Sequence, residues 1–97
     1  MDSAPRRRKT LSKVWAIEVE GKQHLIEVQI DSFLGRHFGH LAVDSKVISK
    51  WTTSVFSGSV PAHLAFEVGG KMGKIRRKGR LFKSPALYFD GKELKPL

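Results

Sequence analysis

The sequence contains no cysteine. This absence excludes disulfide bonds, thiolate metal sites and a cysteine nucleophile. The chain also lacks any apolar run of the ~18 residues that a membrane-spanning helix needs. No apolar segment follows the basic residues near the N-terminus, so we do not expect a secretory signal. Because small secreted domains usually rely on disulfides, we expect an intracellular protein in the cytoplasm, with the nucleus as the alternative.

Catalytic motifs are missing as well. The chain has no G-x-S-x-G, H-E-x-x-H or P-loop pattern. Glu18 and Glu20 alternate along a strand pattern and indicate a solvated edge rather than an acid/base pair. The histidines have no acidic residue at ligand spacing apart from Asp31 and Asp44 at loop ends, so we expect them to be structural. They are His24, His37, His40 and His63. We therefore predict that the protein is not an enzyme and has no metal site and no cofactor.

No stretch of ten or more residues has helical spacing. Apolar and polar residues alternate instead, as in residues 14–20 and 23–30, which is typical of strands with one buried face. We expect tight hairpin turns at 21–22, 44–46 and 90–91, the last with the Asp-Gly pair of a type I′ turn. Seven or eight short strands of this kind predict an all-β protein, an antiparallel β-sandwich.

The domain organisation is simple. A chain of 97 residues has no room for a second core. We expect a basic, disordered tail over residues 1–13 and one sandwich domain over 14–97. Within it, residues 31–37 are expected to form a longer loop. Residues 74–82 are consistent either with a pair of strands or with an irregular basic arm around Gly79.

Positive charge is concentrated at the two ends of the sequence. The net charge is +9, yet residues 14–70 carry more acidic than basic side chains, whereas residues 71–97 carry nine basic and two acidic ones. This asymmetry predicts an acidic partner such as nucleic acid. The alternative is a solvated arm that protects a sheet edge. The candidate polyanion-binding residues are Lys71, Lys74, Arg76, Arg77, Lys78, Arg80 and Lys83, with Arg6, Arg7, Arg8 and Lys9 of the tail.

Three aromatic residues bear on partners. Phe82 and Tyr88 offer stacking faces near the basic segment. Trp51 ends a strand pattern, where it either caps the core or anchors a protein partner. The tail sequence RRRKTLSK is compatible with nuclear import, with phosphorylation around Thr10 and Ser12, and with simple disorder.

Two stretches together resemble a known family. VWAIEVEGKQHLIEVQI at the start and GKIRRKGRLFKSPALYFDGKELKPL at the end are similar to the opening and close of a Fas apoptotic inhibitory molecule domain. The resemblance implies a compact antiparallel β-sandwich that is cytosolic, non-enzymatic and linked to restraint of cell death and of protein aggregation. Characterised members have two such domains and no RRRK tail. Structural roles carry over to Trp15, Gly21, His24, Ile26, Asp90 and Gly91.

We therefore expect a non-enzymatic interaction module. The first hypothesis is protein binding through sheet edges or an exposed strand face. The alternative is binding of nucleic acid or another polyanion through residues 71–83 and the N-terminal tail.

Overall fold

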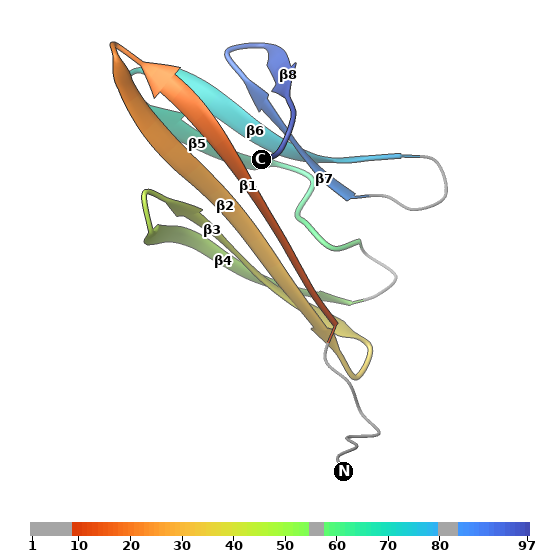
Figure 1. Ribbon diagram of the computed structural model, residues 1–97. Coiled ribbons are helices and arrows are strands. Elements are labelled where there is room, and N and C mark those ends of the chain that lie inside the picture. Colours follow the sequence, from red (N-terminus) through yellow and green to blue (C-terminus); the bar gives the residue numbers. More distant parts are fainter. Residues whose placement is uncertain (1–8, 55–57, 80–83) are drawn as a thin grey trace.

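The computed structural model describes residues 9–54, 58–79 and 84–97 and consists of two packed sheets (Figure 1). Sheet A has the strand order β1-β2-β3-β4 and sheet B the order β5-β6-β7-β8, with antiparallel pairing throughout. The strands of sheet A are β1 (Lys9–Val19), β2 (Lys22–Phe33), β3 (Arg36–Val43) and β4 (Lys46–Ser54). Those of sheet B are β5 (Leu64–Val68), β6 (Lys71–Lys78), β7 (Ser84–Phe89) and β8 (Lys92–Leu94). The prediction of an all-β sandwich is confirmed.

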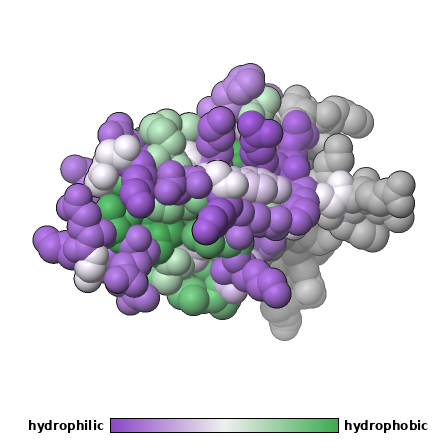
Figure 2. All heavy atoms as spheres, turned by 90° about the horizontal axis from the view of Figure 1, so that it is seen from above, coloured by the Kyte–Doolittle hydropathy of each residue, from purple (hydrophilic) through white to green (hydrophobic). Residues whose placement is uncertain are grey.

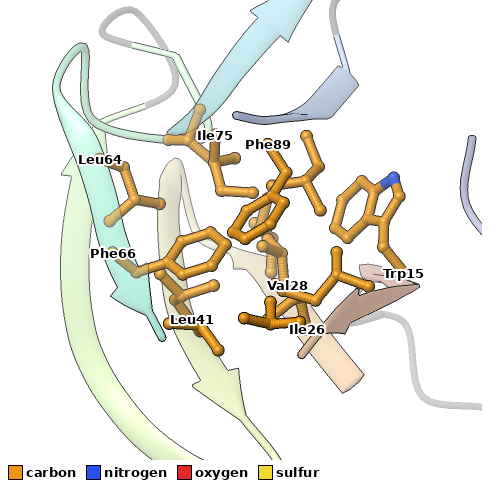
Figure 3. Packing of buried hydrophobic residues seen from close by; sticks show 14 residues of the cluster. Trp15, Ile26, Val28, Leu41, Leu64, Phe66, Ile75 and Phe89 are labelled. Carbon is orange, nitrogen blue, oxygen red and sulfur yellow. The ribbon is translucent and has the colours of Figure 1, made fainter. Parts of the chain in front are cut away.

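One hydrophobic core joins the two sheets (Figure 3). The alternating pattern of each strand places one set of side chains inward, so Trp15 and Ile26 of sheet A meet Ile75 and Leu87 of sheet B, all fully buried. Burial of each such side chain contributes about 1.5–3 kcal/mol. Phe66 and Phe89 stack across sheet B with ring centroids 6.2 Å apart. The outward residues are mostly polar, and Figure 2 shows hydrophilic side chains over most of the end seen from above.

Two-residue turns connect the strands of sheet A. Asp90 and Gly91 in sheet B both have positive φ, as a type I′ turn requires, which confirms that hairpin. Leu34 and Gly35 have the same signs of φ, at 52° and 77°. The prediction of a longer loop over residues 31–37 is therefore wrong: β2 continues to Phe33 and β3 begins at Arg36. The exposed Leu34 adopts a conformation usually taken by glycine or asparagine, so the sequence gives little sign of this turn.

The first strand begins earlier than expected. β1 starts at Lys9, so residues 9–13 belong to the strand, while the rest of the expected tail lies outside the described residues. This segment pairs with β2 because its polar side chains find partners there. Thr10 donates a hydrogen bond to Asp31 at 2.8 Å, and Ser12 donates to Glu27 at 3.4 Å.

The basic segment is also ordered into a strand for most of its length. β6 covers Lys71–Lys78 and pairs with β5 on one side and β7 on the other. It is therefore a central strand of sheet B, and Gly79 follows it. No helix occurs among the described residues, and none there is long and apolar enough to cross a membrane.

Candidate functional site: the outer face of sheet B and the edge of sheet A

A row of cations runs along the outer face of β6. Lys74, Arg76 and Lys78 alternate with residues that face the core, such as the fully buried Ile75, and are therefore exposed to solvent. We call these three residues the cationic row. Since a strand rises about 3.3–3.4 Å per residue, successive members are spaced by about 6.7 Å.

Small side chains flank the cationic row. Ala65 of β5 lies opposite Lys74, and Ala86 of β7 lies opposite Arg76. His63, which precedes β5, and Arg76 both line a hollow of about 280 Å³. A second hollow of about 420 Å³ lies on the other side of Lys74 and is lined by Met72 and Tyr88, with Gly70, Lys71, Asp90 and Gly91 at its border.

Lys78 at one end of the row is paired, as is Lys71 at the start of β6, whereas Lys74 and Arg76 have no such partner among the described residues. Lys78 forms an ion pair with Glu93 at 2.5 Å, and Lys71 forms one with Asp90 at 3.6 Å. The hydrogen bond to the Glu93 carboxylate raises the pKa of Lys78. Within the described part of the chain, Lys74 and Arg76 make no ion pair or side-chain hydrogen bond. These two cations are therefore available to an anionic ligand.

The remaining predicted basic residues fall into different places. Arg77 belongs to the other face of β6, where its guanidinium lies against Gly58. Lys9 starts β1, and the predicted residues Arg6, Arg7, Arg8, Arg80 and Lys83 lie outside the described residues. Lys13 of β1 donates hydrogen bonds of 3.1 Å to Ser84 Oγ and to the Pro85 carbonyl. Since Ser84 is the register partner of Lys78, the beginning of β1 contacts the strand beside the end of the cationic row.

The edge of sheet A presents a second surface. β4 is an outer strand that pairs only with β3 among the described residues. Val47 and Ile48 follow each other along it and are 44% and 46% exposed. A register shift opposite Leu41 and Ala42 marks a β-bulge at this point. A bulge turns a side chain that would otherwise alternate, which explains why two successive apolar residues are exposed.

Trp51, the predicted partner anchor, lies further along the same strand and is half-buried. Its indole ring lies over Gly39 of β3 and packs against the core. Its N–H donates a hydrogen bond of 2.7 Å to the Ser59 carbonyl. Trp51 therefore caps the core. It also lines a hollow of about 430 Å³ together with Phe38, His40 and Lys50.

Two of the histidines, His24 and His37, form contacts between or within neighbouring strands. His24 Nδ1 lies 2.7 Å from Asp44 Oδ2, and the Leu25 N–H donates to Asp44 Oδ1 at 2.9 Å. The hydrogen bond from His24, with the one from Leu25, lowers the pKa of the Asp44 carboxyl. His37 lies 2.6 Å from the Ser32 hydroxyl. In the described ranges no three such side chains come together in a way that would hold a metal ion.

Sequence reasoning found the cations of the row but missed their neighbours. His63, Ala65 and Ala86 belong to other strands or loops, and only the register brings them beside Lys74 and Arg76. A cross-strand register cannot be inferred from a strand pattern alone unless a turn fixes it. The turn at residues 69–70 gives such a signal for β5 and β6, whereas the connection between β6 and β7 includes residues 80–83, which lie outside the described residues.

No family model, curated protein or solved structure matches this chain. The resemblance to the Fas apoptotic inhibitory molecule family therefore stays a prediction.

Proposed function

We propose that the protein is a non-enzymatic interaction module that binds an extended segment of a partner protein along β4. The observation that carries this proposal is the open edge of β4, with Val47 and Ile48 both close to half exposed on it. An extended peptide can add to such an edge through main-chain hydrogen bonds, while side-chain contacts give specificity. The same kind of function is implied by the resemblance to the Fas apoptotic inhibitory molecule family, including its link to apoptosis and protein aggregation.

The charges on β4 indicate the chemistry of the partner. Lys46 and Lys50 are exposed on either side of Val47 and Ile48. Lysines on an edge strand disfavour pairing with a second copy of the same chain, because like charges then meet. A segment with branched apolar residues and one or two carboxylates complements this edge.

Site-specific photo-crosslinking tests the proposal. A photoreactive residue is placed at Ile48 of the full chain, and a matched one at Met72, which is 50% exposed on the outer face of sheet B. After illumination in an extract of cells that produce the protein, the Ile48 position is expected to give a discrete protein adduct. A Val47→Lys substitution should abolish it, because a charge replaces the apolar contact. Equal adducts from both positions, or an adduct that persists with Val47→Lys, contradict the proposal.

A second candidate function, polyanion binding, is favoured by Lys74 and Arg76 on the opposite sheet, which have no ion-pair partner among the described residues. Phosphate contacts of this kind weaken steeply as salt rises. Binding measured at about 50 mM and about 200 mM salt separates it from uncharged contacts.

A further inference from the structure

We propose that the outer face of sheet B binds single-stranded nucleic acid along β6, with phosphates at Lys74 and Arg76 and an unpaired base against Tyr88. This site lies on a different sheet from the β4 edge, so the inference does not depend on the proposed protein partner.

The position of the two cations is the first support. Lys74 and Arg76 are two residues apart on one face of a central strand, so their attachment points are about 6.7 Å apart along β6. This spacing is close to the separation of successive phosphates in an extended nucleic-acid strand. Because both side chains are exposed and unpaired within the described residues, they meet phosphate without first breaking an ion pair.

The shape of the face is the second support. The short side chains of Ala65 and Ala86 leave space beside Lys74 and Arg76. Hollows lie on both sides of these two cations along β6. The hollow at His63 and Arg76 has polar walls that suit a phosphate group. A backbone that follows β6 therefore has a small side chain on one side of each cation, Ala65 beside Lys74 and Ala86 beside Arg76.

Tyr88 distinguishes this ligand from other polyanions. It is the register partner of Lys74 and lines the larger hollow together with Met72. A half-buried tyrosine ring beside a thioether offers an apolar wall next to a cation, the combination on which an unpaired base stacks. A base within a duplex has no free face to offer, and the described chain has no helix to enter a groove.

The charges at the ends limit the length of strand in contact. Glu93 holds Lys78 and Asp90 holds Lys71, and Glu67 stands beside Met72 on β5. Glu67 and Asp90 lie near the start of β6 and Glu93 lies opposite Tyr88 on β8, so carboxylates border Lys74 and Arg76 and disfavour further phosphates there. We therefore expect a site of two or three nucleotides on sheet B, with moderate affinity.

Fluorescence anisotropy of the full-length protein with a labelled ten-nucleotide mixed-sequence single strand tests the inference. The salt dependence of the binding constant is measured for the wild type and for Lys74→Gln and Arg76→Gln. Each substitution is expected to reduce the slope of log K against log[salt] by about 0.7, since one phosphate contact is lost. Lys22→Gln removes an equal charge from an exposed position on sheet A and should leave the slope of the specific site unchanged.

Tyr88→Leu tests the base contact directly. It should weaken binding of the single strand by about five- to 150-fold, the range for loss of one stacked base. Binding of heparin, a polyanion without bases, should be unchanged by the same substitution. Thermal unfolding of the variant shows that the fold is retained, and Tyr88→Phe, which keeps the ring, should bind as the wild type does.

The inference is overturned by no binding of the single strand at about 50 mM salt, by equal effects of Lys22→Gln and Arg76→Gln, or by a loss for Tyr88→Leu that is the same for heparin as for the single strand. Equal or tighter binding of a matched duplex also overturns it, because the base would then have no role.

Discussion

Trp51 lies over Gly39, and its indole ring occupies the space that a Cβ at residue 39 would need. The two residues are register partners on β4 and β3. The glycine allows the ring to close on the sheet, from where its N–H reaches the Ser59 carbonyl. This arrangement holds the chain after β4 against the core and leaves the earlier half of β4 as the exposed edge.

Gly39→Ala should displace Trp51. We expect a loss of about 1–3 kcal/mol in unfolding free energy, typical of overpacking, and a red shift of tryptophan fluorescence as the ring becomes wetter. Chemical denaturation followed by fluorescence measures both. In a Trp51→Leu background the same substitution should cost less, because the smaller side chain leaves space for the methyl group. An equal cost in the two backgrounds contradicts the contact.

Asp44 should make the fold sensitive to acid. Its hydrogen bonds from His24 and Leu25 lower its pKa in the folded state below the value in the unfolded chain. The carboxylate therefore stabilises the fold above the unfolded pKa, and this contribution is lost as pH falls through the folded pKa. Asp44→Asn retains a residue that tolerates the positive φ of this turn. It should flatten the loss of thermal stability below about pH 4, and an unchanged acid limb contradicts this role.

Lys13 should tie the two sheets together. Its ammonium group donates to Ser84 Oγ and the Pro85 carbonyl, which bridges β1 and the start of β7. Lys13→Met retains most of the apolar stem and loses both hydrogen bonds, so we expect a loss of about 1–3 kcal/mol in unfolding free energy. Amide hydrogen exchange at Ser84, Ala86 and Leu87 should accelerate. Lys22→Met is the control, and equal acceleration in both variants contradicts the bridge.

Trp15 should tolerate a smaller aromatic ring better than its burial suggests. The side chain is fully buried, yet its Nε1 has no hydrogen-bond partner among the described residues. Trp15→Phe removes a buried N–H whose desolvation costs about 1–3 kcal/mol, which offsets part of the lost packing. Phe66→Ala, with no such gain, should cost about 3–5 kcal/mol. Denaturant titration compares the two, and a larger loss for Trp15→Phe contradicts the account.

The fold is predicted well from the sequence where a turn contains glycine, asparagine or aspartate. The Asp90-Gly91 hairpin is an example, since only a few residues adopt its backbone readily. The prediction from sequence fails at the turn of Leu34, because a hydrophobic residue at positive φ does not mark a turn in the sequence. The start of β1 was not predicted for a different reason: apart from Leu11, residues 9–13 are polar or basic, and their strand depends on partners such as Asp31 that lie across the sheet.

The candidate site, too, was predictable from the sequence only in part. The exposure of Lys74, Arg76 and Lys78 follows from alternation around Ile75. The ion pair of Lys78 does not follow from this pattern, because Glu93 reaches Lys78 only after β7 and β8 have folded back along the sheet. The role of Trp51 was undecided in the sequence, and its resolution depends on Gly39 of the neighbouring strand.

The most direct test asks whether the β4 edge and the outer face of sheet B are separate binding surfaces. An amide NMR titration with the ten-nucleotide single strand at about 200 mM salt, where loose electrostatic contacts are weak, maps the bound ligand onto the fold. We expect saturable shifts of the amide signals of Lys74, Arg76 and Tyr88 of sheet B, and no change in the amide signals of β4. Shifts centred on β4, or diffuse shifts over both sheets, would contradict this expectation.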